Sequence, residues 1–276
     1  MGFKTLIKKH KLKFGFTLFL IITEAFLALL FPLFIGYAID GAIKGSYNGA
    51  IQLGLLGLAA LIIGVGRRVF DSRFYAKLFQ SMGSTAISMI ENNRPSVKSA
   101  RLSMTRELVE FLENSLPELI SNIIGLFGVI IIIAMLNLNV FYSSLFVVLI
   151  IFQIYWISSK KTIRLNKSSN DEFEKQVDVI SKNNNEELSL HLKKMMQWNI
   201  KLYDLEAVNF SISWIVLVSF LIASIIISGS DGIVQYGVLF SLIMYVFQYM
   251  ENVINLPLFY QNALRLKEIR ERIEQV

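Results

Sequence analysis

The sequence lacks cysteine altogether, contains only two histidines, and carries charged side chains at 17% of its 276 positions. Without cysteine the chain has no disulfide, no thiolate nucleophile and no cysteine-ligated zinc site. His10 and His191 are far apart and no acidic spacing pattern surrounds either. We therefore expect no metal and no cofactor. The low charge content, together with 54% hydrophobic residues, excludes an ordinary soluble domain.

The hydrophobic residues gather in six blocks. A helix needs about 20 residues to cross about 30 Å of hydrocarbon, and each block is close to that length. The blocks cover residues 14–39, 50–69, 116–136, 140–157, 210–228 and 233–255. This pattern predicts an all-α membrane protein with six transmembrane helices.

Positive charge is distributed unequally between the connections. Of the 27 lysines and arginines, 26 lie before the first block, after the last block, or in the connections that follow the second and fourth blocks, when Arg67 and Arg68 at the end of the second block are counted with the connection after it. Lys44 alone lies on the other side. The positive-inside rule then places both termini and both long connections in the cytoplasm. The net charge of +6 reflects this topology, so no nucleic-acid partner is expected.

The connections on the outer side are short, whereas those on the cytoplasmic side cover residues 70–115 and 158–209. Both long segments mix apolar and charged residues at helical spacing, which predicts helices that extend well beyond the membrane. Breaks are expected at Asn183 to Asn185 and near Pro95. Residues 256–276 form a cytoplasmic stub, and we expect a single domain over residues 1–276.

Glu24 lies inside the first predicted span, close to mid-membrane. A charged side chain at that depth costs at least a few kcal/mol unless water or a partner stabilises it. One interpretation is a carboxylate that lines a water-accessible cavity and binds a cationic substrate or a proton. The alternative is an interhelical hydrogen bond that only orders the bundle.

The sixth span carries a stripe of polar residues on one helical face. Its members are Gln248, Glu251, Asn252 and Asn255. The stripe predicts a face turned to protein or water, although Glu251 is also close enough to the membrane boundary to be hydrated there. Tyr245 and Tyr249 flank the stripe and are candidates for cation–π contacts to a substrate, with core packing as the alternative.

The third span repeats the pattern where it enters the membrane. The residues at helical spacing are Asn114, Glu118, Ser121, Asn122 and Gly125. Asn122 is the deepest of the polar side chains and is the candidate cavity residue of this set, whereas Glu118 also favours a helix start after Pro117. Arg67 and Arg68 end the second span and either mark the membrane border or pair with a carboxylate across a cavity.

Small residues recur every three or four positions in the second span, at Gly54, Gly57, Ala60 and Gly64. This spacing predicts a close-packing seam between helices rather than a nucleotide-binding loop.

Four sequence segments lie in order along the chain: LFPLFIGYAIDGAI in the first span, ARLSMTRELVEFLENSLPELI before the third, LYDLEA before the fifth and YGVLFSLIMYVFQYMENVINLPLFYQNALRLKEIRERI in the sixth. Together they resemble the transmembrane domain of exporter-type ABC transporters. The resemblance covers nearly the whole chain. It implies six helices with short outer turns and two long inner helical excursions, a sixth helix that lines the substrate path, and a location in the bacterial inner (cytoplasmic) membrane.

The sequence departs from that family in one respect. It contains no G-x-x-x-x-G-K-[ST] loop and no LSGGQ-type signature, and no glycine is followed by lysine. The backbone cradle and the lysine that hold ATP phosphates are therefore missing from it. We expect a membrane half that lacks a nucleotide-binding domain and is not itself an enzyme.

Three functions are compatible with these features. The first is a proton-coupled secondary carrier of cationic or amphipathic small molecules or peptides, because ATPase-free relatives of this fold import peptides in bacteria. The second is the membrane subunit of a split ABC transporter with a separate ATPase chain. The third is a membrane interaction or assembly protein. Because one six-helix half seldom encloses a substrate path in this architecture, the resemblance also implies a homodimer.

Overall fold

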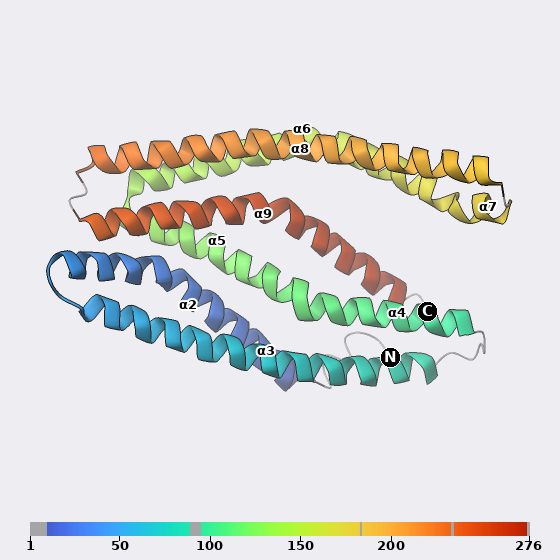
Figure 1. The fold of residues 1–276 in the computed structure, drawn as a ribbon, viewed down its shortest axis with the longest axis horizontal. Coiled ribbons are helices and arrows are strands. Elements are labelled where there is room, and N and C mark those ends of the chain that lie inside the picture. Colours follow the sequence, from blue (N-terminus) through green and yellow to red (C-terminus); the bar gives the residue numbers. More distant parts are fainter. Residues whose placement is uncertain (1–9, 89–94, 183, 233–234, 275–276) are drawn as a thin grey trace. The chain divides into compact units, whose positions relative to one another are not determined.

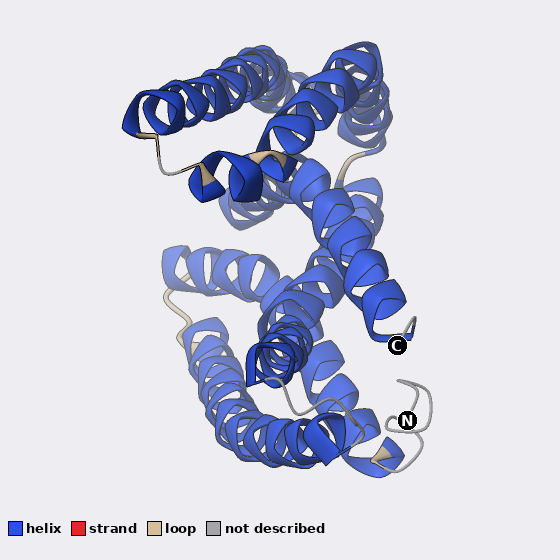
Figure 2. Cartoon of the chain, turned by 90° about the vertical axis from the view of Figure 1, so that its right-hand side faces the viewer, coloured by secondary structure: helices blue, strands red, loops and turns tan. Residues whose placement is uncertain are grey.

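The computed structural model describes residues 10–88, 95–182, 184–232 and 235–274, and within these ranges the chain is helical without strands (Figures 1 and 2). The elements are α2 (Lys11–Ile43), α3 (Asn48–Ser88), α4 (Pro95–Glu110), the π-helical turn η1 (Phe111–Ser115), α5 (Leu116–Leu136), α6 (Leu138–Glu174), α7 (Gln176–Ser181), α8 (Asn185–Ser230) and α9 (Tyr236–Glu274).

Six stretches of helix within the described residues are long and apolar enough to cross a membrane. They are Lys11–Ile43, Asn48–Thr85, Thr105–Leu136, Leu138–Ser181, Asn185–Ser230 and Tyr236–Leu256. Large apolar side chains on their surfaces are exposed, among them Leu58, Leu61 and Ile62 of α3. Such continuous apolar surface suits lipid rather than water. The predicted all-α membrane fold with six spans is confirmed.

The helices run well past the hydrophobic blocks. The 46 residues of α8 correspond to about 69 Å of helix, more than twice the about 30 Å of hydrocarbon. The predicted break before α8 is present, because the Asn184 Oδ1 atom accepts hydrogen bonds from the backbone N–H groups of Glu186 (3.0 Å) and Glu187 (3.4 Å). On the other segment α4 begins at Pro95, and the residues just before it lie outside the described ranges.

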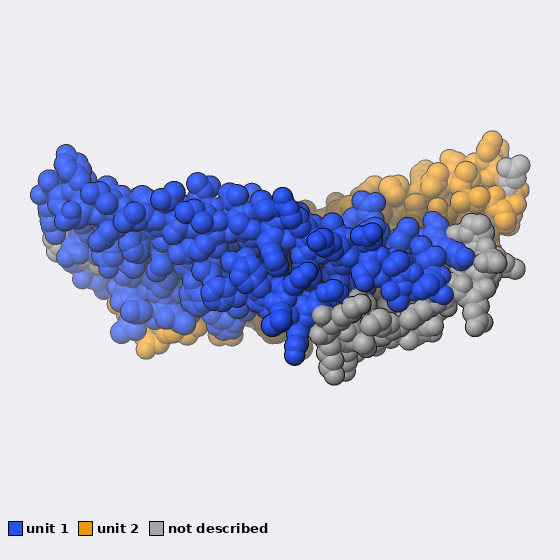
Figure 3. Space-filling model, turned by 90° about the horizontal axis from the view of Figure 1, so that it is seen from below, with its two compact units in different colours: residues 1–138, 228–276 blue, residues 139–227 orange. Residues whose placement is uncertain are grey.

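The chain divides into two compact units, which are coloured separately in Figure 3. Unit 2 comprises residues 139–227 and is the hairpin of α6 and α8. Side-chain hydrogen bonds join its two long helices, from Ser158 Oγ to Asn209 Oδ1 (2.7 Å) and between His191 Nδ1 and Glu172 Oε1 (3.1 Å). Unit 1 comprises residues 1–138 and 228–276.

Within unit 1, α2 lies against α3, α5 and α9, and α5 also lies against α9. A cluster of buried side chains fixes the beginning of α2 against the second half of α3, α4 and η1. Its members are Phe14, Phe74, Tyr75, Leu78, Met82, Leu108, Val109, Phe111 and Leu112. The rings of Phe14 and Phe74 meet edge to face with centroids 5.3 Å apart.

A tight seam joins α2 to the beginning of α9. The Asp40 carboxylate accepts a hydrogen bond from the backbone N–H of Gly237 (2.8 Å), in the first turn of α9, where the helix dipole favours negative charge. Further along, Ser241 Oγ donates to the Pro32 carbonyl (2.8 Å) and Tyr245 Oη donates to the Leu29 carbonyl (2.7 Å). The seam requires close backbone approach, so both helices carry glycine at the contact.

Replacing Gly237 with alanine is expected to lower the free energy of unfolding by about 1–3 kcal/mol, the usual cost of overpacking. A Cβ atom at Gly237 would overlap the Gly36 carbonyl oxygen and lie 2.6 Å from Asp40 Oδ2. Thermal unfolding in detergent micelles, followed by circular dichroism, measures the change. Gly57→Ala is the control, because no described atom lies within 4 Å of a Cβ there. Equal melting temperatures for the two variants would contradict the seam.

The same open surroundings correct one sequence prediction. Gly54 and Gly57 do not form a close-packing seam within the described part of the chain, since nothing lies within 4 Å of a Cβ at either position. Gly64 does have a close neighbour, because a Cβ there would lie 3.3 Å from Glu24 Oε1.

Candidate functional site

Unit 1 contains a cavity of about 720 Å³ between α2, α3, η1, α5 and α9. Five carboxylates line it, contributed by all of these elements: Glu24, Asp71, Glu113, Glu118 and Glu251. Two guanidinium groups, those of Arg67 and Arg68, also line it. With every group ionised the lining carries a net charge of −3, from five negative and two positive groups. The cavity is therefore suited to cations.

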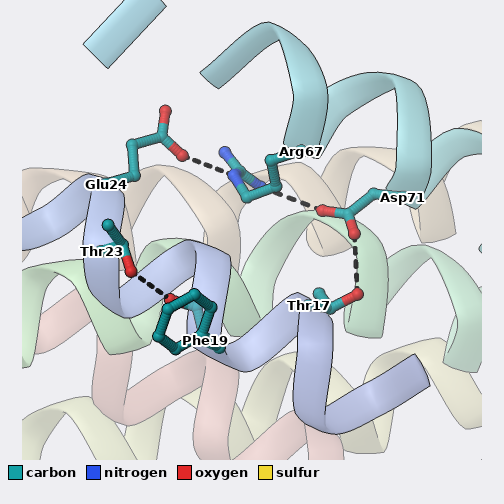
Figure 4. Close-up of polar contacts among 6 residues, drawn as sticks. All are labelled: Thr17, Phe19, Thr23, Glu24, Arg67 and Asp71. Atoms are coloured by element: carbon teal, nitrogen blue, oxygen red, sulfur yellow. Dashed lines mark hydrogen bonds and ion pairs between the residues drawn. The ribbon is translucent and has the colours of Figure 1, made fainter. Parts of the chain in front are cut away.

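Glu24 is both paired and open to the cavity. Arg67 Nε donates to Glu24 Oε2 (2.5 Å), while Arg67 Nη1 donates to Asp71 Oδ2 (3.2 Å) (Figure 4). Thr17 Oγ1 completes the chain by donating to Asp71 Oδ1 (2.9 Å). The Glu24 side chain is 31% exposed, whereas that of Asp71 is 6% exposed. Both sequence interpretations of Glu24 thus describe part of its setting, an interhelical contact in the wall of a cavity.

Arg67 takes the second of the two roles that its position allowed. It pairs with carboxylates on α2 and α3 instead of lying free at a membrane border. Arg68 also lines the cavity and is exposed, and it forms no ion pair with a described residue.

The π-helical turn η1 shapes one side of the cavity. Leu116 donates its backbone N–H to the Phe111 carbonyl, five residues earlier. Pro117 follows directly and has no N–H, so the ordinary four-residue hydrogen bond cannot form from that position. Such turns mark functional sites in many helices. Here the turn brings Glu113 and Asn114 to the lining.

The polar stripe predicted at the entry of the third span lies along the cavity. All five of its members belong to the lining: Asn114, Glu118, Ser121, Asn122 and Gly125. The side chain of Asn122 donates to the Glu118 carbonyl (2.9 Å), which fixes its amide on the wall. Glu118 also stands in the first turn of α5, as its position after Pro117 predicted.

Three members of the α9 stripe join the same cavity, namely Gln248, Glu251 and Asn252. Glu24 and Glu251 therefore face one shared space. The Asn252 amide packs against Gly125, where a Cβ would lie 3.2 Å from Asn252 Nδ2. The Gln248 Oε1 atom is buried and receives no hydrogen bond from the described residues. An acceptor of this kind suits an N–H donor of a ligand or an O–H donor of water.

The other three candidate residues of α9 do not join the lining. Asn255 lies outside the lining set, one turn beyond Glu251. Tyr245 and Tyr249 are completely buried, and the Tyr245 hydroxyl is used in the seam with α2. Neither ring offers a face to the cavity, so core packing, the alternative for these tyrosines, describes their setting.

Asp71 and Glu113 are the cavity carboxylates that sequence reasoning missed. Both fall in the segment that the hydropathy pattern assigned to a long connection, residues 70–115. One signal for Asp71 was present, because it follows Arg67 by four residues and the two are neighbours on any continuous helix. Glu113 gives no comparable signal.

Comparison with known proteins bears on the whole arrangement. Residues 3–237 match the family described as ABC transporter transmembrane region. No curated protein sequence matches the chain. The matched segment includes all of α2 to α8 and thus four of the five elements that line the cavity. The protein is an integral membrane protein with a transport-related membrane domain, and it belongs to the ABC transporter transmembrane region family.

Proposed function

We propose that this protein is a proton-coupled secondary transporter of cationic or amphipathic small molecules or peptides. The observation that supports this most directly is the cavity with five carboxylates and two guanidinium groups. Placing an ionisable side chain within the membrane costs free energy, and such side chains mark substrate or proton pathways. Glu24 and Glu251 are the proposed coupling groups, since each can hold either a proton or a substrate cation.

The seam between α2 and α9 supports an alternating-access cycle. It joins the end of α2 to the beginning of α9. The cavity lies away from the seam, towards the beginning of α2 and the middle of α9. The positive-inside pattern would place the seam on the outer side of a bacterial inner membrane and both termini in the cytoplasm. In this proposal the present conformation is closed to the outside, and opening requires separation of α2 from α9.

The transporter is proposed to work as a homodimer, in which a second copy completes the substrate path. The proposed cycle does not use ATP hydrolysis by this chain, whose sequence contains no G-x-x-x-x-G-K-[ST] loop to hold ATP phosphates. A proton gradient would supply the energy instead.

Flux through reconstituted vesicles tests the proposal. The purified chain in phosphatidylcholine vesicles should accumulate radiolabelled 1,5-diaminopentane when a pH gradient is imposed. Replacing both Glu24 and Glu251 with glutamine should lower the gradient-driven transport rate at least about tenfold. Loss of a charged contact worth about 1.4 kcal/mol corresponds to a tenfold change.

The matched control replaces Glu110 and Glu206 with glutamine. Both carboxylates are exposed and neither lines the cavity, so the change in net charge is the same. Unchanged pH-driven flux in the Glu24 and Glu251 variant would refute proton coupling through these groups.

Membership in an ABC transporter family supports a second candidate, the membrane subunit of a transporter whose ATPase is a separate chain. Affinity purification of the protein from native membranes discriminates between the two. Capture of a stoichiometric ATPase that energises diamine flux without a pH gradient would favour the split transporter, whereas gradient-driven flux by the chain alone favours the secondary carrier.

A further inference from the structure

Two carboxylates share the Arg67 guanidinium, and their surroundings differ. Both oxygens of Asp71 are engaged, by Thr17 and by Arg67, and its side chain is 6% exposed. Glu24 receives Arg67 on Oε2 only, and its Oε1 receives no hydrogen bond from the described residues. Because its side chain is also 31% exposed, Glu24 is the partner that solvent and ligands can reach.

The two contacts also differ in how they depend on the fold. Arg67 and Asp71 stand one turn apart on α3, so their contact persists whenever that helix is formed. The contact with Glu24 joins α3 to α2. Loss of the Glu24 contact leaves Arg67 still paired with Asp71, so no unpaired buried charge results.

We propose that Arg67 is a tethered competitor for the Glu24 carboxylate. A cation or a proton that reaches Glu24 takes the place of the guanidinium, which stays on Asp71. Occupation of the cavity thereby breaks an ion pair between α2 and α3, and Arg67 sets the cation concentration at which this happens. This inference rests on the proposed function for its substrate class and adds the residue that tunes the site.

Three other carboxylates give an incoming cation its first contact. Glu113, Glu118 and Glu251 line the same cavity and form no ion pair with a described residue. A small organic cation is drawn to this cluster and then meets Glu24 held by Arg67. Arg67 is thus a specificity-determining residue, because cations that bind Glu24 too weakly to displace the guanidinium are excluded from that carboxylate.

Calorimetry on the full chain in phosphatidylcholine nanodiscs tests the competition with 1,5-diaminopentane as the probe. The test variant replaces Arg67 with glutamine and Asp71 with asparagine together. Because one positive and one negative group are lost, the net charge of the cavity is unchanged, and a general field effect predicts no change in affinity. Competition predicts that the diamine binds about tenfold more tightly, since Glu24 is now free.

Three further variants sharpen the test. Adding Glu24→Gln to the double variant should abolish the gain in diamine affinity. Glu24→Gln alone should lower the wild-type affinity by less than the same substitution lowers the affinity of the double variant, because in the wild type Arg67 already occupies that carboxylate. Arg67→Lys keeps the charge for Asp71 but loses the planar fork that reaches two carboxylates, so it should bind the diamine more tightly than the wild type even if the double variant does not fold.

Equal diamine affinity in the wild type, the double variant and Arg67→Lys would overturn the competition and leave the transport proposal standing. Tighter binding in the variants without any pH-driven flux in vesicles would support the competition and refute the proposed function. Absence of diamine binding in every variant would overturn both.

Discussion

Replacing Asp71 with leucine is expected to lower the free energy of unfolding by about 1–3 kcal/mol, the cost of leaving the hydrogen-bond partner of a buried group unsatisfied. The Asp71 carboxylate is 6% exposed and is the anchor for both Arg67 and Thr17. Without it, Thr17 loses its acceptor and the guanidinium keeps only Glu24. Unfolding in mixed micelles of dodecyl maltoside and dodecyl sulfate measures the loss.

A matched substitution separates this effect from the addition of an apolar side chain. Asp171→Leu removes an exposed carboxylate on α6 and should change stability by no more than about 0.5 kcal/mol. The combined replacement of Arg67 and Asp71 by glutamine and asparagine should cost less than Asp71→Leu, because the asparagine amide oxygen can still accept the hydrogen bond of Thr17. If the neutral pair were the more destabilising of the two, the Arg67 to Asp71 contact would not be the anchor described above.

The sequence predicted the general architecture because long apolar blocks and the distribution of lysine and arginine are local signals. The six spans follow from hydropathy alone, and the break before α8 follows from the asparagines whose member Asn184 caps that helix. The helix ends were harder to place. An apolar run indicates only which part of a helix lies in lipid. Helix α3 continues for about a further 19 residues after Val69, where packing around Phe74 and Tyr75 stabilises it.

The candidate site was only partly predictable for a related reason. Polarity inside a span is conspicuous, so Glu24, Gln248 and Asn252 could be found from their depth and spacing. Asp71 was missed, because it lies beyond the apparent end of its span and was counted with a connection, and its spacing from Arg67 was the one signal that could have identified it.

Helical spacing alone also failed to separate Tyr245 and Tyr249 from their polar neighbours. The same face of α9 that carries Gln248 also carries these rings, and only the position of α2 decides that Tyr245 donates to the Leu29 carbonyl instead of facing a ligand. Which helix covers which part of a stripe is a property of the tertiary packing, and a single sequence does not contain it in a readable form.

Neutralising the three cavity carboxylates that have no described ion-pair partner is expected to have the largest effect on ligand binding. The variant replaces Glu113, Glu118 and Glu251 with glutamine together. If each partly exposed contact with a cation contributes about 1 kcal/mol, the affinity for 1,5-diaminopentane should fall roughly hundredfold. Calorimetry in phosphatidylcholine nanodiscs at low ionic strength measures the change, and added salt should shrink it.

The decisive comparison is with three glutamates that lie outside the cavity. Replacing Glu110, Glu186 and Glu206 with glutamine changes the net charge by the same amount, and all three carboxylates are exposed. If both triple variants lost the same affinity, the diamine would be responding to overall charge rather than to a site. If only the cavity variant loses affinity, the three carboxylates that have no ion-pair partner among the described residues attract the cation, and Glu24, released by Arg67, completes its binding. Adding Arg67→Gln and Asp71→Asn to the cavity variant should still raise its affinity for the diamine, because Glu24 is then free.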